Sequence, residues 1–594
     1  MQHRGPDGHG LEIFGNVGLV HTRLAIVDLT DSAKQPMTTP DGGWSIAFNG
    51  EIFNHTALRR ELGPRPFAST GDTATLLQAL AAWGPDCVRR LNGQFALAAF
   101  DVRRERLLLS RDRWGIKPLY LARTDEGLWF ASEPSALVAA GVRANWPADG
   151  WRAVRRGSCY SGTRTLAEGI VRLRPGTSAF VSTQTGELTL SAWASPVDGI
   201  SATRQQAMRN KPRRILSQEL ELVLRRAVHD SMLGDVPIGT LCSGGVDSSL
   251  ITALASEVEP DLIAFGAHYR GDPALDEGPP AARAAAAIGV ELDLLEVTET
   301  AWRLDFPRAT VHFGAPLANA SSVVVAQMAQ RARSRGRVVL LTGEGADELF
   351  GGYEGLHGRQ LAKVLSPAAR MLRALEPALI PGYRERRAVI RDRLIALRAR
   401  RRTEPGWSSL SHDPAFGSIH AAATQAYAHH GDPHRAVEAD LLSHMDYTLG
   451  HLLNRMDKNM MQHSVEARVP FLDPAVVGFV LNLPLEMRVG PWTKGLLRDV
   501  ARRLLPIDVA HRPKVYGMDF DAGVWIDAAA DRRFLSDGLL RDLVRITRAE
   551  FEGLVAATTG ADRVRVWSTE VWCRALLAGQ PLPAIEAELW PSGP

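Results

Sequence analysis

The stretch that decides the fold is Ser243-Gly244-Gly245-Val246-Asp247-Ser248-Ser249, which stands between the β-rich run VPIGTL (236–241) and the helical pattern LITALASEV (250–258). A strand that ends in a glycine-rich turn and opens a helix directs main-chain N–H groups and the positive end of the helix dipole at one point. This arrangement predicts a phosphate site, with hydroxyl donors from three serines and a carboxylate, Asp247, that is able to hold Mg²⁺. The loop lacks the lysine of a Walker loop. The alternative is a Ser/Gly turn that only caps a helix.

A second loop with unusual chemistry follows the run RVVLL (337–341) and reads TGEGADE (342–348). Acidic residues among glycines at a strand end repel one another unless a cation offsets them. Because ligands of parallel α/β sheets gather at the carboxyl ends of the strands, we predict that the two loops face one pocket. Asp247 and Asp347 would then hold Mg²⁺, and Glu344 is the candidate base. The alternative is an acidic helix N-terminus that only complements the dipole.

The pattern of the chain changes in its middle. Residues 21–181 contain short β-rich runs separated by Gly, Asp and Pro turns, which predict layered β-sheets with a helix at Thr73–Trp83. From Gln205 onward, apolar residues at helical spacing alternate with short β-rich runs, which predict a parallel α/β sheet and a helical tail.

The boundary between these halves is expected in the polar segment 182–212, which is rich in Ser, Thr, Gly and Gln. We therefore expect one domain over residues 1–190, a linker over 191–212 and a second domain over 213–594. A length of 594 residues is in keeping with two large units.

Composition excludes several classes of protein. With 45% hydrophobic and 23% charged residues, the chain is typical of ordinary globular proteins. It has no apolar run of the roughly 18 to 20 residues that span a bilayer and no hydrophobic stretch near Met1, so a cytoplasmic protein without a membrane partner is expected. The net charge of +3 is too small to indicate a nucleic-acid partner.

Cysteine and lysine are both scarce. The four cysteines (Cys87, Cys159, Cys242 and Cys573) lie far apart and lack the paired spacing of a zinc site or a disulfide framework. Seven lysines stand against 62 arginines. A lysine in this chain is therefore informative, because its compact ammonium group does not replace a guanidinium fork.

Taken together, these motifs resemble those of the asparagine synthetase family of glutamine-dependent amidotransferases. SGGVDSS (243–249) is similar to the pyrophosphate-binding loop of that family, and GEGADELFGGY (343–353) to its second signature. The likeness runs in order through HRGPDG (3–8), HTRLAIVD (21–28), NGEIFNH (49–55), SRDRWGIKPLY (110–120), FASE (130–133), DKNMMQHSVEARVPFLD (457–473), KGLLRDVARRLLP (494–506) and HRPKVYG (511–517).

The resemblance implies an N-terminal Ntn-type α-β-β-α sandwich, a class II glutaminase lacking its first strand, joined to a parallel α/β ATP-pyrophosphatase domain with a helical tail. In that family ATP adenylates a carboxylate, pyrophosphate leaves with Mg²⁺, and ammonia from glutamine attacks the acyl-adenylate. We therefore expect an asparagine synthase type of ligase that uses ATP and Mg²⁺. Its expected partners are small molecules, namely aspartate or another carboxylate and glutamine or ammonia, and the resemblance allows a homodimer.

The resemblance also implies the residues of the synthetase site. ATP contacts are expected from Leu241, Ser243, Gly244, Gly245, Asp247, Ser248, Ser249, Ala267, Thr342 and Gly343, and Mg²⁺ contacts from Asp247 and Asp347. Glu344 corresponds to the position tied to intermediate formation and ammonia deprotonation. Lys514 corresponds to a lysine that neutralises charge developing on phosphate, for which the alternative is a surface charge.

For the glutaminase site, the resemblance implies a glutamine-binding set made of Arg23, Leu24, Ala25, Ile26, Val27, Asn49, Gly50, Glu51 and Asp72. Arg23 would clamp the α-carboxylate, and Asn49 with Gly50 would form the oxyanion hole. Glu51 and Asp72 would hold the amino group. The alternative for each is a polar residue that caps a loop.

One departure from the family concerns the nucleophile. Class II glutaminases use the thiol of an N-terminal cysteine with its own α-amine as base, whereas this sequence starts Met1-Gln2-His3. In one interpretation the natural protein begins upstream with Met-Cys. In the other it has lost glutaminase activity and uses free ammonia or forms another bond. We expect the 594-residue polypeptide not to hydrolyse glutamine.

Two further hypotheses remain open from the sequence. The same chemistry could amidate or cyclise another carboxylate, as β-lactam synthetases and lasso-peptide cyclases of this superfamily do. A non-catalytic scaffold is the third hypothesis, against which the intact Asp247, Glu344, Asp347 and Lys514 argue. The segment APLANASS (315–322) is a candidate acceptor pocket that sequence alone does not resolve.

Overall fold

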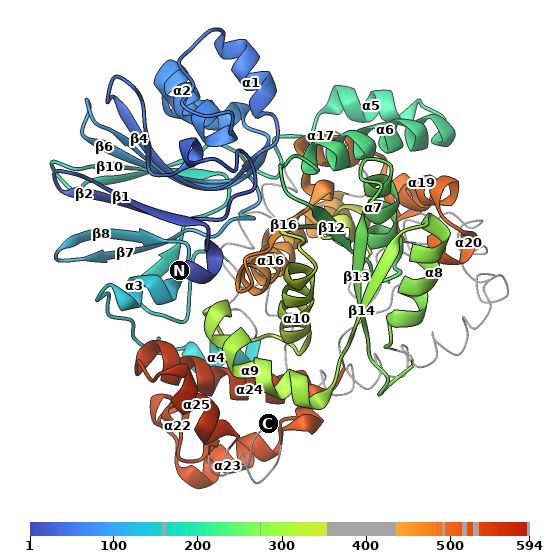
Figure 1. Cartoon of the computed structure of the whole chain (residues 1–594). Helices are drawn as coiled ribbons and strands as arrows, with labels where there is room; N and C mark the ends of the chain where they lie inside the picture. Colours follow the sequence, from blue (N-terminus) through green and yellow to red (C-terminus); the bar gives the residue numbers. More distant parts are fainter. Residues whose placement is uncertain are drawn as a thin grey trace.

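A computed structural model describes residues 1–156, 162–273, 275–352, 435–489, 493–513, 520–526 and 534–590. Lys514, a predicted catalytic residue, lies outside these ranges. The chain folds into an antiparallel β sandwich followed by a parallel sheet with helices (Figure 1). This fold class is the one expected from the sequence, and it is confirmed.

The N-terminal sandwich comprises strands β1 to β11 and helices α1 to α4. Its strands are β1 (Gly8–Phe14), β2 (Val17–Arg23), β3 (Met37–Thr38), β4 (Trp44–Ile52), β5 (Gly93–Asp101), β6 (Arg106–Arg111), β7 (Tyr120–Thr124), β8 (Gly127–Ala131), β9 (Ile170–Arg172), β10 (Thr177–Ser182) and β11 (Leu188–Ala192). Its helices are α1 (His55–Leu62), α2 (Asp72–Trp83), α3 (Pro134–Ala139) and α4 (Gly150–Arg156).

The strands of the sandwich form layers. A six-stranded antiparallel sheet has the order β11-β10-β6-β5-β4-β3, and two smaller sheets have the orders β8-β7-β9 and β1-β2. Helices α1 and α2 cover one side of the large sheet, and the smaller sheets lie on its other side with α3 beyond them (Figure 1). The layering is therefore α-β-β-α.

Alternation along strand β5 explains why both of its faces are covered. Phe95 and Leu97 belong to the same apolar cluster as Leu77 of α2, whereas Ala98 belongs to a second cluster with Leu19 of β2. Successive side chains of a strand point to opposite faces, so a continuous apolar run requires a layer on each side. The run QFALAAF, which is buried throughout, meets this requirement.

The remainder of the chain contains a five-stranded parallel sheet of order β14-β13-β12-β15-β16. The strands are β12 (Ile238–Leu241), β13 (Ile263–His268), β14 (Glu291–Glu296), β15 (Val339–Leu341) and β16 (Glu466–Arg468). The chain runs outward from β12 to β13 and β14, and then returns to the other side of β12 for β15 and β16. The strand order therefore reverses between β12 and β15, which is where open parallel sheets bind ligands.

Helices surround this sheet and form the tail (Figure 1). They are α5 (Ala202–Arg209), α6 (Arg213–Ser231), α7 (Val246–Ser256), α8 (Gly278–Ile288), α9 (Glu299–Phe313), α10 (Ser321–Ser334), α11 (Ala346–Phe350), α16 (Arg435–Met461), α17 (Pro474–Val480), α18 (Leu485–Val489), α19 (Gly495–Leu504), α20 (Ile507–Ala510), α22 (Leu539–Val544), α23 (Arg548–Ala556), α24 (Ala561–Trp572) and α25 (Leu582–Leu589).

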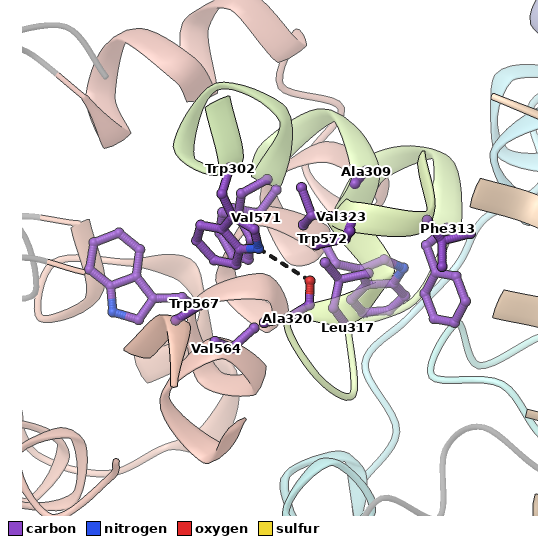
Figure 2. Close-up of a cluster of buried hydrophobic side chains, with 14 of the residues drawn as sticks. Trp302, Ala309, Phe313, Leu317, Ala320, Val323, Val564, Trp567, Val571 and Trp572 are labelled. Atoms are coloured by element: carbon purple, nitrogen blue, oxygen red, sulfur yellow. Dashed lines mark hydrogen bonds between the residues drawn. The ribbon is translucent and has the colours of Figure 1, made fainter. Parts of the chain in front are cut away.

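The tail is fixed to the sheet domain by large aromatic side chains. Trp302 of α9 and Trp567 and Trp572 of α24 are buried in one cluster, which Figure 2 shows. The indole N–H of Trp302 donates to the carbonyl oxygen of Ala320 at 3.2 Å, so its one polar group is satisfied. Burial of three indoles at one junction fixes the helical tail against α9 and the residues just before α10.

The predicted linker at 191–212 contains the end of β11 and helix α5, and the division into domains stays a prediction. In the part of the chain that the structure describes, we find no helix whose length and apolar character would let it cross a membrane.

Candidate active site

The two loops predicted from the sequence lie side by side. Strands β12 and β15 pair in parallel, with Thr240 opposite Leu341, so the loops that follow them leave the same edge of the sheet. A Cβ atom on Gly343 would lie 2.9 Å from the main-chain nitrogen of Ser248 and 3.0 Å from the Cβ of Asp247. The absence of a side chain at Gly343 is therefore what permits the acidic loop to touch the hydroxyl-rich loop.

A lysine joins the two predicted metal carboxylates. The Nζ atom of Lys494 forms ion pairs with an oxygen of Asp247 and with Oδ1 of Asp347, the latter at 2.6 Å. Lys494 is buried and has a positive φ of 66° where it precedes α19. Lys494 is the first residue of the motif KGLLRDVARRLLP (494–506), but the sequence analysis assigned it no role. The scarcity of lysine was the signal that could have found it.

The hydroxyl-rich loop is organised around two serines. The main-chain N–H of Ser243 donates to Oγ of Ser248 at 3.1 Å, and their hydroxyls are also 3.1 Å apart. Gly244 has a positive φ of 67°, and a Cβ there would lie 2.3 Å from the carbonyl carbon of Pro280 in α8. Ser249 is placed differently, because its buried hydroxyl lies 3.9 Å from Sγ of Cys242.

The surroundings of these loops fit a nucleotide with a divalent cation. The loop before α7 offers hydroxyls and main-chain N–H groups at the start of an eleven-residue helix. Within the described residues, Oδ1 of Asp247 is buried and has no hydrogen-bond partner. Such an oxygen, close to a second carboxylate, suits a hard cation that binds phosphate. Leu241 ends β12, and Ala267 is buried in the neighbouring strand β13.

Glu344 is paired with an arginine that sequence reasoning missed. Nη2 of Arg455, in α16, donates to Oε1 of Glu344 at 3.1 Å, and Nη1 of Arg455 donates to Oγ of Ser321 at 3.0 Å. Ser321 belongs to the APLANASS segment and begins α10. The structure therefore brings the candidate base and the candidate acceptor segment to one guanidinium group. The sequence offers no local signal for Arg455.

Two carboxyl side chains that are predicted to bind glutamine, those of Glu51 and Asp72, lie close together at the edge of the sandwich. Glu51 is in β4 and Asp72 begins α2, where Oδ2 of Asp72 accepts the main-chain N–H of Ile52 at 2.9 Å. Burial, followed by the nearby charge of Asp72, raises the pKa of Glu51 well above its usual range. Burial likewise raises the pKa of Asp72. Close carboxyl groups with raised pKa values are suited to binding a cationic group.

The predicted oxyanion residues sit next to this pair. Gly50 has a φ of 149°, and a Cβ there would lie 2.0 Å from the carbonyl oxygen of Gln94. Nδ2 of Asn49 donates to Oγ of Ser132 at 3.4 Å.

Arg23 is the last residue of β2, and the predicted residues after it, 24–27, form a loop. The guanidinium of Arg23 donates to the carbonyl oxygens of Asp28 and Thr30, the latter at 2.8 Å. Within the loop, the N–H of Ala25 donates to Asp7 at 2.8 Å. Leu24, Ile26 and Val27 pack in an apolar cluster together with the parallel sheet.

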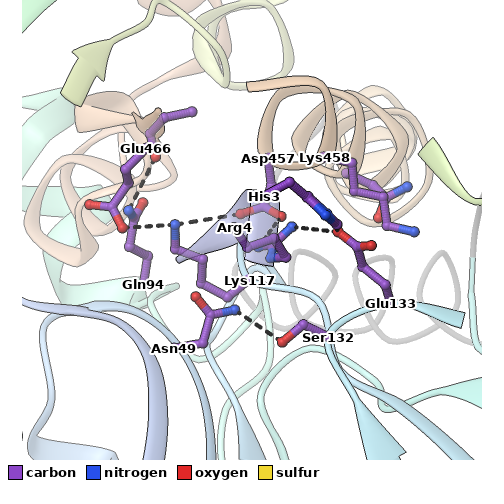
Figure 3. Close-up of polar contacts among 12 residues, drawn as sticks. His3, Arg4, Asn49, Gln94, Lys117, Ser132, Glu133, Asp457, Lys458 and Glu466 are labelled. Atoms are coloured by element: carbon purple, nitrogen blue, oxygen red, sulfur yellow. Dashed lines mark hydrogen bonds and ion pairs between the residues drawn. The ribbon is translucent and has the colours of Figure 1, made fainter. Parts of the chain in front are cut away.

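Charged side chains link the sandwich to the rest of the chain, as Figure 3 shows. Arg4 donates to Asp457 of α16 at 2.8 Å and to Glu133 at 3.3 Å. Nζ of Lys117 lies 3.5 Å from Asp457 and 2.9 Å from Glu466 of β16. All five side chains are buried. Their charges alternate, so each buried ion has a partner of opposite sign.

Comparison with known proteins agrees with this arrangement. Residues 219–590 match the family described as Asparagine synthase, and residues 1–193 match the one described as Glutamine amidotransferase domain. The chain belongs to the asparagine synthase family. It is accordingly an enzyme of the glutamine-hydrolysing asparagine synthase type, a ligase with a glutamine amidotransferase domain, and ATP binding is typical of that family.

Individual relatives of this asparagine synthase family member share much of its length. Asparagine synthetase (glutamine-hydrolyzing) 1 of Bacillus subtilis strain 168 is 29% identical over 534 residues, which cover 86% of this chain and 81% of that protein. A putative asparagine synthetase (glutamine-hydrolyzing) of Mycobacterium tuberculosis strain H37Rv is 30% identical, with coverages of 87% and 82%. Amidase chyE of Penicillium rubens is 27% identical over 61% of this chain and 55% of its own length.

Proposed function

We propose that this enzyme uses ATP and Mg²⁺ to adenylate aspartate and then transfers ammonia to it, giving asparagine, AMP and pyrophosphate. The observation that carries the proposal is Lys494, which is held between Asp247 and Asp347 where two loops of adjacent parallel strands touch. A buried ammonium group, held between two carboxylates at the ends of the strands, is able to stabilise negative charge on the phosphates.

The roles proposed for the loops follow from their chemistry. The N–H and hydroxyl groups of Ser243 to Ser248 bind the phosphates of ATP. Asp247 and Asp347 would hold Mg²⁺, which would supply positive charge beside the phosphates. Lys494 adds a fixed positive charge at the same place. Lys514, which lies outside the described residues, keeps the role that the resemblance implies for it, that of a cation at the reacting phosphate.

Two steps make up the reaction, and each forms one bond and breaks another. A carboxylate oxygen of the acceptor attacks the α-phosphorus of ATP, and the bond from that phosphorus to pyrophosphate breaks. Ammonia then attacks the acyl carbon, the carbon–oxygen bond to AMP breaks, and Glu344 accepts the proton that nitrogen loses. A carboxylate oxygen is a poor leaving group, so adenylation is what makes the second step feasible.

The neighbourhood of Glu344 supports an acidic acceptor. Arg455 lies between Glu344 and Ser321, and its guanidinium is a suitable partner for a carboxylate. Among the described residues, Nε of Arg455 is buried without a hydrogen-bond partner. Aspartate has two carboxylates, of which only one reacts. The Nε–H group of Arg455, close to the reacting carboxylate, is able to bind the other.

We propose that the sandwich binds glutamine and, if the full-length protein carries an N-terminal cysteine as nucleophile, supplies ammonia from it. Glu51 and Asp72 would hold the amino group of glutamine, Asn49 and Gly50 would form the oxyanion hole, and Arg23 with the loop to Val27 would hold the α-carboxylate. Free ammonia is the alternative nitrogen source.

The test of the ligase reaction is direct. The purified chain is supplied with aspartate, ATP, Mg²⁺ and ammonium, and AMP, pyrophosphate and asparagine should appear in equal amounts. Asp247→Asn should abolish aspartate-dependent pyrophosphate release, whereas Asp261→Asn, an exposed aspartate before β13, should leave it unchanged. Formation of ADP and phosphate would contradict the proposal.

A second candidate is amide formation or cyclisation on a different carboxylate. The observation that favours it is the similarity to Amidase chyE over 61% of the chain, since that name denotes another activity. A panel of amino acids and dicarboxylates, scored by pyrophosphate release, separates the candidates. Aspartate as the best substrate supports the first, and another carboxylate that exceeds aspartate supports the second.

A further inference from the structure

Arg468, at the end of β16, is a fully buried arginine that contacts both halves of the chain. Its Nη2 donates to Oε2 of Glu51 in the sandwich at 3.1 Å. Its Nε donates to Oε1 of Glu466 at 2.9 Å, and its Nη1 donates to the carbonyl oxygen of Ser231 at 2.8 Å. Every nitrogen of the guanidinium is therefore used, which fixes the direction of the fork.

The main chain of the same residue supports the nucleotide side. Strands β15 and β16 pair with Leu341 opposite Arg468, and the N–H of Thr342 donates to the carbonyl oxygen of Arg468 at 2.9 Å. Thr342 and Gly343 begin the acidic loop that touches Asp247. The backbone of Arg468 thus contacts Thr342, at the candidate nucleotide site. Its side chain contacts Glu51, at the candidate glutamine site.

The contact between Arg468 and Glu51 is next to a carboxylate oxygen that could bind a ligand. The side chain of Glu51 is buried, and among the described residues its Oε1 has no hydrogen-bond partner. One oxygen is therefore held by Arg468, while the other has no donor among these residues and lies close to the carboxyl group of Asp72. An ammonium group that donates to Oε1 would satisfy it, because a buried carboxylate oxygen without a donor is unfavourable.

The charge state of Glu51 depends on its surroundings. Burial and Asp72 of α2 raise the pKa of Glu51, as does Glu466 of β16, whereas the positive charge of Arg468 acts in the opposite direction. An ionised Glu51 attracts an ammonium group, and a protonated one does not. The guanidinium from β16 therefore opposes the other groups, although the pKa of Glu51 remains raised with Arg468 in place.

We propose that Arg468 is a positioning residue of the glutamine site, contributed by the parallel-sheet half, which holds one oxygen of Glu51 so that the other is presented to the amino group of glutamine. This inference rests on the glutamine site proposed above. It means that the sandwich does not complete this site alone, because one of the groups that define it belongs to the strand beside the nucleotide loop.

The experiment compares full-length variants at Arg468. Arg468→Gln should weaken glutamine binding, measured by titration calorimetry, at least about tenfold, which corresponds to about 1.4 kcal/mol. The variant should bind glutamine only at a higher pH than the unaltered protein does, since Glu51 holds its proton more tightly without Arg468. Arg468→Lys keeps the charge but not the fork, so it should show a smaller loss and a smaller pH shift.

Controls separate this role from a general loss of structure. Ammonium-dependent pyrophosphate release by Arg468→Gln should fall by a smaller factor than its glutamine affinity, because the main-chain bond to Thr342 does not involve the side chain. Arg574→Gln removes another arginine from a buried glutamate, Glu570, in the helical tail, and it should leave glutamine affinity unchanged. Glu51→Gln should lose as much glutamine affinity as Arg468→Gln, and the double variant should lose little more.

Three outcomes would overturn the inference. The first is an Arg468→Gln variant that melts like the unaltered protein and binds glutamine with the same affinity and pH profile. The second is an equal fall in glutamine binding and ammonium-dependent activity, which indicates a purely structural role. The third is an unaltered chain that binds no glutamine at any pH, which contradicts the proposed glutamine site as well. The first two outcomes leave that site intact.

Discussion

Arg4 and Asp457 lie 453 positions apart in the sequence, and a 2.8 Å hydrogen bond joins their buried side chains across the junction between the sandwich and helix α16. Lys117 approaches the same carboxylate from another loop of the sandwich. One aspartate therefore compensates two buried cations, and the junction depends on it more than on any exposed ion pair.

Asp457→Asn should therefore destabilise the protein. Removal of one member of a buried ion cluster leaves the remaining charges less well compensated, with a typical cost of about 3 kcal/mol. The free energy of unfolding from urea titration, followed by tryptophan fluorescence, measures the change. Asp86→Asn, which breaks an exposed pair with Arg89, is the control and should not change the unfolding midpoint. Equal midpoints for both variants would contradict this account of the junction.

Lys494→Met should abolish adenylation while the protein remains folded. Without the ammonium group, Asp247 and Asp347 repel each other and the phosphates lose a cation, so ATP–pyrophosphate exchange should fall about 100-fold or more. The matched control is Lys211→Met, which removes a lysine paired with Glu219 away from the loops. Exchange rates close to those of the unaltered enzyme would show that Lys494 only tethers α19.

Gly343→Ala should weaken ATP binding. The added methyl group would meet the main chain of Ser248 at 2.9 Å, a distance that backbone atoms do not tolerate, so the two loops must separate. The KM for ATP in the ammonium-dependent reaction should rise about tenfold.

The comparison for this variant is Gly450→Ala, inside helix α16, where among the described residues no atom beyond the adjoining backbone of the helix lies within 4 Å of the added carbon. Gly450→Ala should keep the KM and gain up to about 1 kcal/mol of stability from helix propensity. If both alanine variants kept a normal KM, contact of the loops would not matter for ATP.

Stability should decline as the pH falls from about 6.5 to about 4. Burial, followed by the charge of His3, lowers the pKa of His312 to about 4, with Glu133, His463 and Arg308 also facing it. The unfolded chain therefore binds the proton first, and the folded state loses up to about 1.4 kcal/mol per pH unit from this group. Melting temperatures between pH 4 and 7 measure the slope.

His312→Gln should make this slope shallower, because the side chain no longer titrates. His21, whose pKa burial lowers to about 4, should maintain part of it. His9→Gln changes an exposed histidine and should leave the slope as it is. A slope unaffected by His312→Gln would assign the acid sensitivity to other groups.

Local sequence chemistry was enough to find the loops of the site. Ser243 to Ser249 and Thr342 to Glu348 follow β-rich runs, and parallel strands place such loops at one edge whatever the length of chain between them. The short β-rich runs of residues 21–181 likewise predicted layered sheets. These features depend on residues that are neighbours in sequence, or on a general property of the fold.

The residues that complete the candidate sites depend on contacts that no local pattern encodes. Lys494 pairs with a carboxylate 247 positions away, and Arg468 with one 417 positions away. Lysine scarcity was a usable hint, because Lys117, Lys458 and Lys494 are all buried. Arginine, with 62 copies, offers no such contrast, so Arg455 and Arg468 emerged only once the strands and helices were placed.

The charged character of the junction has a consequence for anyone who divides the chain. A cut between β11 and α5 would uncover Arg468, Glu466 and Asp457 together with the ions that face them. The two fragments would associate through long-range attraction between their opposite charges. Their affinity should therefore drop as sodium chloride is added, because dissolved ions screen that attraction.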